Sequence, residues 1–334
     1  MSWLSDEAIS RLKEAGSLPG VSGTRYRLVE RIGSGGMGVV YLAEDSVLER
    51  RVALKILDLP DMTDAAGALS ERLLREAKIL ARLEHPGIVP VHDAGTLADG
   101  RVFYAMKFVE GKRLDQLVET PADEPAGDSL SDRLRIFQRI CDAVGFAHAR
   151  GVLHRDLKPE NIMTGPFGEV LVMDWGIAKI LGPATAGSIP PVQQSATGSH
   201  PVQSKTTAHG TVLGTRGYMS PEQARGEVEN LDVRADIFSL GAILAFLLGD
   251  AQKAPRAVAA IAQKAMQAEP SDRYGSVSDL ALDVAHYLDG MPVSAYPENI
   301  LRKTARWASR YRVAIVLVLT YLVVRGLLIL FLHR

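Results

Sequence analysis

The sequence predicts an α+β fold of two lobes, with one transmembrane helix at the C-terminal end. Three observations predict this arrangement. Short segments rich in Val, Leu, Ile and Tyr alternate with turn residues over the small N-terminal lobe, residues 25–109. Helical patterns dominate the larger C-terminal lobe, residues 110–290. The run 313–332 is apolar except for Arg325 and has the length, roughly 20 residues, that crosses a bilayer core.

The N-terminal lobe is expected to contain strands and one main helix. Apolar residues recur at helical spacing along 69–83, which predicts an amphipathic helix there. The dipeptide Asp99-Gly100 favours a turn, so a hairpin is expected around it. Three further strands, separated by turn residues, are expected over 26–33, 38–45 and 50–59.

The larger lobe is predicted to be mostly helical. A long helix is expected after a Pro-, Asp- and Gly-rich loop at 120–129, with Ser131 or Asp132 as its N-cap and Gly151 just after its end. Cys141 lies within the apolar pattern of this helix, which favours a buried structural thiol over a reactive one. Because Cys141 is the only cysteine, no disulfide forms within the chain, and a reducing compartment is the simpler interpretation.

The two ends of the chain are predicted to differ. Residues 1–24 lack the features of a signal peptide and are interpreted as a helical extension with a packing role. Residues 291–312 form a basic linker before the apolar run 313–332, and positive charge marks the cytoplasmic side of a membrane. We therefore expect a single-pass protein of the cell membrane, with the globular part cytoplasmic and the C-terminus outside. A buried helix of a soluble domain is the alternative for the run; within it, Arg325 is expected either to mark a helix–helix contact or to be merely tolerated.

Two features of the N-terminal lobe point toward phosphate groups. The glycine-rich run Gly33–Val40 lies between two predicted strands instead of opening a helix. That context disfavours a dinucleotide-binding fingerprint and suits a hairpin that covers nucleotide phosphates. Lys55 lies on the third predicted strand, and Glu76 in the following helix is its expected partner. A surface salt bridge of little energetic value is the alternative for this pair.

Three motifs in the helical lobe carry the strongest signal. The run His154–Asn161 reads HRDLKPEN, Asp174–Gly176 reads DWG, and Ser220–Glu222 reads SPE. In this order and spacing they resemble the protein kinase family, which carries HRD with a following Asn, then DFG, then APE. The resemblance covers residues 25–290, most of the chain. It implies the two-lobed protein kinase fold, with an activation segment at 174–222.

The resemblance implies ATP and Mg²⁺ as cofactors, with Mn²⁺ as an alternative metal. Asp156 resembles the catalytic base that accepts the proton of the substrate hydroxyl, and Lys158 is expected to contact the γ-phosphate. Asn161 and Asp174 supply oxygen ligands suited to a hard cation. Thr215 resembles the threonine that bonds the catalytic aspartate and lysine. The implied ATP-binding residues, with Met106 as gatekeeper and Phe108 in the hinge 107–109, are Ile32, Gly33, Ser34, Gly35, Gly36, Met37, Gly38, Val40, Ala53, Lys55, Glu76, Met106 and Phe108.

Other residues are implied to have structural or regulatory roles. Asp236 is expected to anchor the catalytic loop, which contains His154 and Arg155, and Arg273 is expected to pair with Glu222. In the family, an arginine next to the catalytic aspartate often binds a phosphorylated residue of the activation segment. Autophosphorylation is therefore expected at Thr206, Thr207 and Thr211. A disordered polar loop without a regulatory role is the alternative for that part of the segment.

The sequence departs from the family pattern in two places. Trp175 stands where the family usually has Phe, and it is expected to pack against the helix that carries Glu76. Between Gly249 and Ala257 the chain is too short for the proline-rich loop and helix that related kinases place there. Their absence is expected to expose apolar surface of the central helix, which a partner or a second copy of the chain would cover.

These observations together predict a membrane-anchored serine/threonine protein kinase. Lys158, Pro159 and Glu160 after the catalytic aspartate resemble the serine/threonine branch of the family. The expected partners are ATP, protein substrates and the membrane, with a homodimer through the kinase domain or the transmembrane helix as a further option. The formal net charge of −1 points away from nucleic acid. A scaffold without turnover and a kinase of small molecules are the alternatives.

Overall fold

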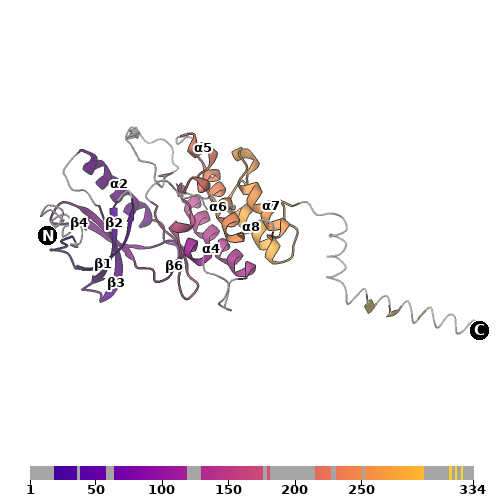
Figure 1. The fold of residues 1–334 in the computed structure, drawn as a ribbon, viewed down its shortest axis with the longest axis horizontal. Coiled ribbons are helices and arrows are strands. Elements are labelled where there is room, and N and C mark those ends of the chain that lie inside the picture. Colours follow the sequence, from indigo (N-terminus) through magenta and orange to yellow (C-terminus); the bar gives the residue numbers. More distant parts are fainter. Residues whose placement is uncertain are drawn as a thin grey trace, which may run out of the picture.

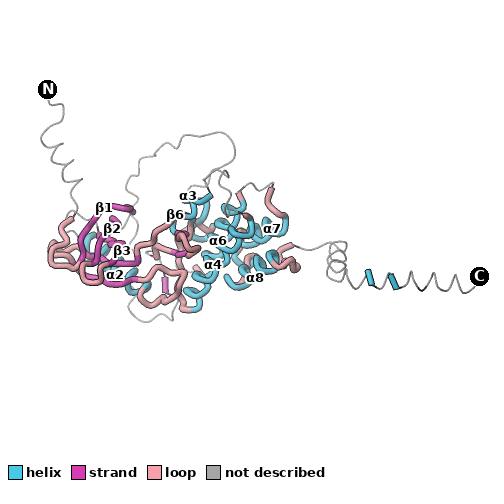
Figure 2. The backbone as a smooth tube through the Cα atoms, turned by 90° about the horizontal axis from the view of Figure 1, so that it is seen from below, coloured by secondary structure: helices cyan, strands magenta, loops and turns pink. Residues whose placement is uncertain are grey.

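The computed structural model shows two lobes of different secondary structure (Figure 1). The strands of the main sheet and one helix gather at one end of the molecule, and most of the other helices gather at the other end, as the tube in Figure 2 also shows. This confirms the expected two-lobed α+β arrangement of the globular part. The described residues are 19–35, 38–57, 64–118, 129–175, 179–180, 215–226, 231–249, 253–296, 316–317, 320–321 and 325.

The N-terminal lobe is a five-stranded antiparallel sheet with one helix. The sheet order is β1-β2-β3-β5-β4, so the hairpin of the last two strands joins the third strand through β5. Alternation along β3 buries apolar residues on one side and directs Ala53 and Lys55 to the other. The elements are β1 (Tyr26–Gly35), β2 (Gly38–Asp45), β3 (Arg50–Ile56), α2 (Asp64–Leu80), β4 (Val91–Thr96) and β5 (Val102–Lys107).

The sheet curls until its two edge strands touch. The Tyr26 hydroxyl at the start of β1 donates to Asp93 of β4 at 2.9 Å, and the Tyr26 ring meets that of Phe103 edge-on at 5.8 Å. Arg25 adds an ion pair to Asp93 at 3.3 Å. The curled sheet encloses a small apolar core of its own, made of Tyr26, Ala43, Val52, Leu54, Ile56, Leu97, Phe103 and Ala105. This core stiffens the sheet that carries Lys55.

The C-terminal lobe is built around helix α4. Its helices are α3 (Leu114–Val118), α4 (Leu130–Ala149), α5 (Pro221–Ala224), α6 (Val233–Leu248), α7 (Arg256–Ala265) and α8 (Val277–Leu288). Short strands β6 (Lys112–Arg113), β8 (Ile162–Thr164) and β9 (Val170–Val172) form one sheet, and β7 (Val152–Leu153) pairs with β10 (Lys179–Ile180). Both small sheets flank the loop 154–161, so they fix its two ends.

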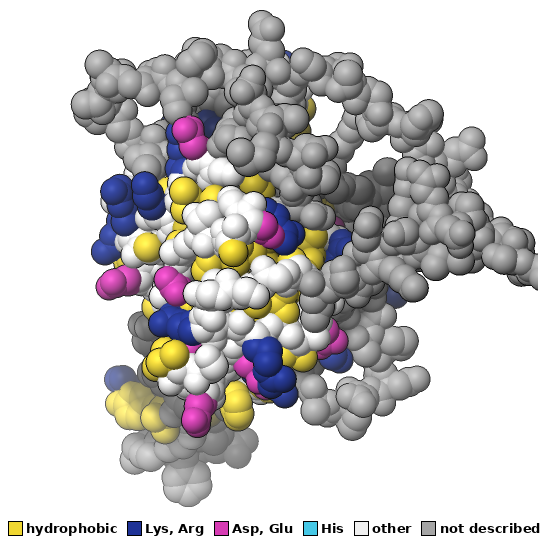
Figure 3. All heavy atoms as spheres, turned by 90° about the vertical axis from the view of Figure 1, so that its left-hand side faces the viewer, with side chains coloured by type: hydrophobic (Ala, Val, Ile, Leu, Met, Phe, Trp, Pro, Cys, Tyr) yellow, Lys and Arg dark blue, Asp and Glu magenta, His cyan; other side chains and the backbone are white. Residues whose placement is uncertain are grey.

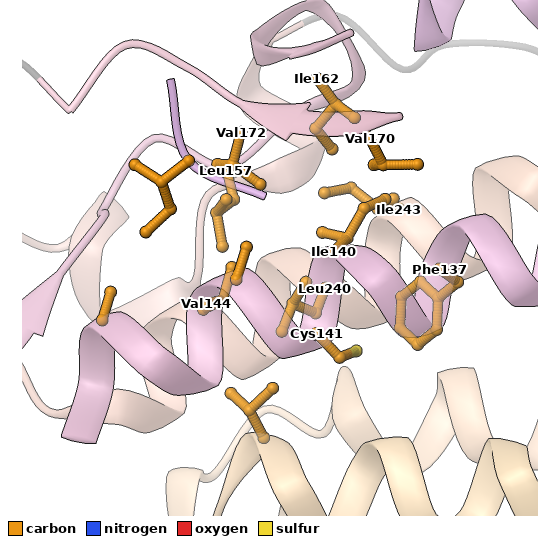
Figure 4. Close-up of a cluster of buried hydrophobic side chains, with 14 of the residues drawn as sticks. Phe137, Ile140, Cys141, Val144, Leu157, Ile162, Val170, Val172, Leu240 and Ile243 are labelled. Carbon is orange, nitrogen blue, oxygen red and sulfur yellow. The ribbon is translucent and has the colours of Figure 1, made fainter. Parts of the chain in front are cut away.

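The main core joins α4 to α6 and to the strands beside that loop. Val144 of α4 points toward Leu157 and Val172, while Ile140 lies beside Ile243 of α6 (Figure 4). Cys141 lies in the same core, and its burial raises its thiol pKa well above the ordinary value. The thiol is therefore protonated and unreactive at neutral pH, as expected from its position in the sequence.

The N-cap of the long helix lies two or three residues earlier than predicted. Ser129 is its N-cap: its backbone is extended, and its hydroxyl accepts the N–H of Asp132 at 3.2 Å. The prediction of Ser131 or Asp132 as the cap was wrong, because Ser129 already provides the side-chain oxygen three residues before Asp132. The predicted hairpin turn is confirmed, with Gly100 at φ 87° and Leu97 N–H donating to the Arg101 carbonyl at 2.8 Å.

The short connection after α6 does not leave apolar surface exposed on that helix. Helix α7 packs directly against α6, and a Cβ at Gly241 would lie only 2.7 Å from that of Ala265. Phe246 and Leu248 are partly buried against the core, and α6 carries none of the exposed large hydrophobic side chains among the described residues. The expectation of an exposed α6 face was therefore wrong, because α7 packs against α6 directly after the short connection.

Several predictions concern residues outside the described part. The N-terminal segment 1–18 and most of the run 313–332 lie there, although Arg325 itself is described. Across the described ranges we find no helix with the length and apolar character needed to cross a membrane. Thr206, Thr207 and Thr211 also fall outside the described residues.

Candidate active site

A cavity of about 520 Å³ lies where the two lobes meet, a size that suits a small-molecule ligand. On the N-terminal side it is lined by residues of β1, β2 and β3, and on the C-terminal side by residues of the loop that follows Lys158. The end of β5 and the hinge, residues 106–109, line the part between the two lobes. The predicted site residues that line it are Ile32, Gly33, Ser34, Gly38, Val40, Ala53, Lys55, Met106, Phe108, Asn161 and Asp174.

The outer end of the N-terminal lobe, away from this cavity, carries interspersed basic and acidic side chains (Figure 3).

The glycine-rich hairpin needs glycine at Gly38. This residue has φ 144°, and a Cβ there would lie 2.3 Å from the Ile56 carbonyl oxygen. Any side chain would therefore push β2 away from β3. Gly35 pairs with Gly38 across the hairpin, whereas Gly36 and Met37 at its tip lie outside the described residues.

Lys55 reaches across the cavity wall to two carboxylates. Its Nζ lies 3.0 Å and 3.2 Å from the two oxygens of Glu76 on α2, and 3.2 Å from Asp174 Oδ1. The Tyr104 hydroxyl donates to Glu76 Oε1 at 2.7 Å, so Glu76 has a partner at each side. Glu76 is only 1 % exposed, which is tolerable because it is paired and hydrogen-bonded. The predicted Lys55–Glu76 pair is thus a buried contact and not a surface salt bridge.

The charges of this cluster stabilise one another. Burial disfavours the charged form of Lys55, but Glu76 and Asp174 outweigh it and raise its pKa above the ordinary value. Burial likewise opposes ionisation of Asp174, yet Lys55 holds its pKa below the usual range. Both groups are therefore charged at neutral pH. Burial, followed by the Glu76 charge, raises the pKa of Tyr104, which keeps its hydroxyl a donor.

The loop 154–161 places a second group of polar side chains. Lys158 Nζ lies 2.9 Å from Asp156 Oδ2. Asn161 Nδ2 donates to the Asp156 backbone carbonyl at 2.8 Å and to its Oδ2 at 3.3 Å. Because Lys158 and Asn161 both contact Asp156 Oδ2, they fix the orientation of the Asp156 carboxylate. Because the amide nitrogen of Asn161 is used in this way, its Oδ1 is the atom left for a ligand.

Asp236 holds the backbone of this loop from below. Its carboxylate accepts the N–H of His154 at 2.9 Å and that of Arg155 at 2.8 Å, and His148 Nε2 lies 2.7 Å from it. Burial disfavours the ionised form, but the hydrogen bonds from His148 and Arg155 keep the pKa of Asp236 below its ordinary value. The predicted anchoring contact of Asp236 is therefore present, with His148 as a partner that the sequence did not reveal.

His154 links the loop to Asp174. Its Nδ1 accepts the N–H of Asp156 at 3.3 Å, so Nε2 carries the hydrogen and donates it to the Met173 carbonyl at 2.9 Å. The rings of His154 and Trp175 lie 4.5 Å apart, centre to centre, and are tilted by 49°, and Trp175 is fully buried. Trp175 lies in the same apolar core as α2 residues such as Leu73. The backbone of Asp174 is in the left-handed region, with φ 58°, which is strained for a residue other than glycine. The contacts of His154 with Met173 and Trp175, the residues on either side of Asp174, hold the backbone in this conformation.

The SPE motif is fixed by a buried ion pair. Arg273 contacts Glu222 with two nitrogens, at 2.6 Å and 2.8 Å, and also donates to the Arg234, Gln267 and Ala268 carbonyls. Burial opposes ionisation of Glu222, but Arg273 lowers its pKa below the ordinary value. The predicted pairing is thus present. Thr215 begins the short helix Thr215–Tyr218 just upstream, and its side chain is not described.

The residues present suit a divalent cation held together with phosphate oxygens. Asn161 and Asp174 line the same cavity and offer one amide and one carboxylate oxygen. Hard cations such as Mg²⁺ prefer oxygen ligands and are often held by one or two carboxylates plus substrate phosphates. No cluster of three or more His, Cys, Asp or Glu ligands occurs within the described ranges. A metal at this site would therefore depend on the nucleotide for further ligands.

Sequence reasoning missed several residues of the cavity. Tyr104 could have been found from strand alternation, because it lies two residues before Met106 on the same face of β5. The others come from separate elements, and no local pattern marks them. The missed lining residues are Val89, Tyr104, Glu110, Gly111, Arg113, Gln116, Met163 and Met173.

Comparison with known proteins agrees with this geometry. The sequence matches the protein kinase domain family over residues 26–269. It is 34 % identical over 323 residues to the serine/threonine-protein kinase PknD of Protochlamydia amoebophila, covering 84 % of this chain and 32 % of PknD. It is 37 % identical over 316 residues to PknD of Chlamydia trachomatis serovar D, covering 84 % of this chain and 33 % of that protein. The chain thus spans about a third of the length of these relatives.

A solved structure shows the same fold. The crystal structure of the PknI kinase domain of Mycobacterium tuberculosis superimposes with a TM-score of 0.55 at 26 % sequence identity, covering 81 % of this chain and all of that domain. The family match spans both lobes and every motif described above. The chain therefore belongs to the protein kinase domain family.

Proposed function

We propose that this chain is a serine/threonine protein kinase, which transfers the γ-phosphoryl group of ATP to Ser or Thr hydroxyls of proteins. One observation carries the proposal. Lys55, Asn161 and Asp174 line the same cavity. Glu76 holds Lys55, and Asn161 contacts Asp156, which lies beside Lys158. Phosphoryl transfer needs this combination of positive charge, oxygen ligands and a base more than it needs covalent chemistry.

Each group has a role in the transfer. Lys55 binds the α- and β-phosphates, and Glu76 and Tyr104 hold it in place. The substrate hydroxyl gives its proton to Asp156 as its oxygen forms a bond to the γ-phosphorus, and the bond to the β–γ bridging oxygen breaks to release ADP. Lys158 neutralises charge on the transferred group. Asn161 and Asp174 would hold Mg²⁺, or Mn²⁺, which would neutralise charge on the phosphate oxygens.

Protein serine and threonine side chains are favoured over other acceptors. The chain carries Lys158, Pro159 and Glu160 from the second residue after Asp156, and its relatives include bacterial serine/threonine-protein kinases. The SPE motif, with its Arg273 ion pair, is machinery typical of protein kinases. A scaffold without turnover is disfavoured because the full set of charged residues makes mutual contacts.

We further propose a membrane-anchored arrangement. The basic linker 291–312 and the apolar run 313–332 support a single-pass helix, with the kinase domain 25–290 cytoplasmic and the C-terminus outside. Residues 1–24 form an N-terminal extension, and a homodimer through the kinase domain or the membrane helix is compatible with this arrangement. Retention in membranes after alkaline carbonate extraction, with a C-terminal tag accessible only from outside, is the expected result.

Regulation is proposed through the activation segment 174–222. Thr206, Thr207 and Thr211 are the autophosphorylation sites we favour. The Arg155 guanidinium would then bind the phosphate group of the phosphorylated threonine. Mass spectrometry of the chain after incubation with ATP tests this directly, because phosphate on none of the three threonines in an active preparation would contradict it.

The acceptor class can be tested with the full chain in detergent. We expect ³²P transfer from γ-labelled ATP to dephosphorylated casein when Mg²⁺ or Mn²⁺ is present, and acid hydrolysis should yield phosphoserine and phosphothreonine. Label found only in phosphotyrosine, or only in small alcohols such as free sugars, would contradict the proposal.

A further inference from the structure

The side chain of Gln223 connects two segments of the site that lie far apart in the sequence. Its Oε1 accepts the backbone N–H of Ser220 at 3.3 Å and the Ser220 hydroxyl at 3.0 Å. Its Nε2 donates to the backbone carbonyl of Arg155 at 2.8 Å. The partners fix the orientation of the amide, because the opposite orientation would face oxygen with oxygen at Arg155 and nitrogen with nitrogen at Ser220.

The acceptor of this bond is an unusual residue. Arg155 has φ 69°, a left-handed conformation that is unfavourable for a non-glycine residue. Both peptide groups around it are held by side chains, since Asp236 accepts its N–H at 2.8 Å and Gln223 donates to its carbonyl. The carbonyl belongs to the peptide that leads directly into Asp156. Its direction therefore sets the course of the backbone at Asp156.

Gln223 is itself well placed to act as a fixed support. It lies in α5 between Glu222, which is bound by the buried Arg273, and the end of that short helix. Ser220 at the start of α5 is fully buried. The strained backbone at Arg155 is thus held by a residue that is itself anchored in the C-terminal lobe.

We propose that Gln223 is a positioning residue for phosphoryl transfer: its amide holds the Arg155 carbonyl and so aligns Asp156 with the substrate hydroxyl. This role rests on the proposed kinase function. Gln223 does not line the nucleotide cavity, so its loss should slow the chemical step and leave ATP binding unchanged. A misalignment of about 1 Å can cost on the order of 100-fold in rate.

The test uses the full chain in detergent with Mg²⁺, ATP and dephosphorylated casein. Gln223→Glu keeps the size and the acceptor for Ser220 but places a carboxylate oxygen against the Arg155 carbonyl; Gln223→Met keeps the size and removes both polar contacts. Gln263→Glu is the matched control, because Gln263 is exposed on α7. Single-turnover rate constants, measured with a saturating excess of enzyme over ATP, do not depend on the fraction of folded protein and so separate positioning from stability.

We expect both Gln223 variants to lower kcat and the single-turnover rate constant by about 10- to 100-fold, with KM for ATP changed by less than about twofold. The control should match the wild type. Wild-type single-turnover rates in both variants would overturn the positioning role, as would a loss explained wholly by fewer nucleotide-binding sites. Absence of transfer by the wild type would instead overturn the proposed kinase function, and the positioning role with it.

Discussion

The Lys55 cluster and the Asp236 anchor both hold charged groups of one site, yet they use different partners. Lys55, Glu76 and Asp174 come from three elements and contact one another through side chains. Asp236 instead accepts two backbone N–H groups of a single loop, with His148 beside it. Asp174 is 43 % exposed at its side chain, whereas Asp236 is fully buried.

Because one set of contacts is made by side chains at the cavity and the other by the backbone in the core, we expect the first to matter for turnover and the second for folding. Side-chain contacts that face the cavity can be exchanged for contacts to a nucleotide and a metal when these bind. Backbone contacts in the core leave no such freedom, and they fix the loop that carries Asp156 before any ligand arrives. We therefore expect substitutions in the Lys55 cluster to affect mainly turnover, and substitutions at the Asp236 anchor to affect stability as well.

The largest effect is expected for Asp174→Asn. Replacing the ligand carboxylate by an amide should lower kcat/KM about 1,000-fold, which corresponds to about 4 kcal/mol of transition-state stabilisation. Stability should change by less than about 1 kcal/mol, since Asn tolerates the left-handed backbone as well as Asp does. Steady-state kinetics measure the loss of kcat/KM, and urea unfolding of the same preparation measures the change in stability. A large loss of stability would remove the contrast with Asp236.

Asp236→Asn should show the opposite balance. An amide supplies one acceptor oxygen where the carboxylate serves His154, Arg155 and His148, so a buried N–H is left without its partner. We expect the unfolding free energy to fall by about 3 kcal/mol, measured by urea denaturation. Asp142→Asn, an exposed position on α4, is the control and should change stability very little. Equal stability of the two variants would argue against the anchor.

The pH dependence of stability follows from the same carboxylates. The folded-state pKa values of Asp236 and Glu222 lie below their ordinary values. Their stabilising contribution is therefore complete above the unfolded-state values, about 3.9 and 4.3, and is lost as the pH falls through the lower folded-state values. Urea midpoints should thus drop below about pH 4.5. Asp236→Asn should flatten this drop; an unchanged slope would count against the assignment.

The smallest effect is expected for Tyr104→Phe. The substitution removes the hydrogen bond to Glu76 Oε1, while both contacts between Lys55 and Glu76 remain. Stability should fall by about 1 kcal/mol, and turnover by a few-fold. Thermal unfolding and kinetics at saturating ATP provide the measurement. A loss as large as that of Asp174→Asn would show that Tyr104 does more than support Glu76.

The motifs predicted the nucleotide-facing part of the site better than its supports. Lys55, Asp156 and Asp174 belong to short runs whose residue types already indicate their chemistry. The structure brings Lys55 and Asp174 together with Glu76 and places Asp156 beside Lys158 and Asn161. Gln223 and His148 act through single contacts to distant segments, so nothing near them in the sequence reveals the partner.

The fold shows the same limit. Local patterns predicted the strands and the long helix, because periodicity follows directly from burial on one face. The close packing of α7 on α6 at Gly241 could not be predicted, since it depends on how two helices approach in space. The error at the N-cap is a smaller case, in which Ser129 lay inside a segment already interpreted as a loop.

The kinase function itself is tested most directly by comparing the full-length wild type with Asp156→Asn. Each is incubated in detergent with Mg²⁺, γ-labelled ATP and dephosphorylated casein, and binding of a fluorescent ATP analogue is measured on the same samples. We expect equal nucleotide affinity and phosphate transfer by the wild type alone. Nucleotide binding by both proteins without transfer by either would contradict the account and favour a scaffold without turnover.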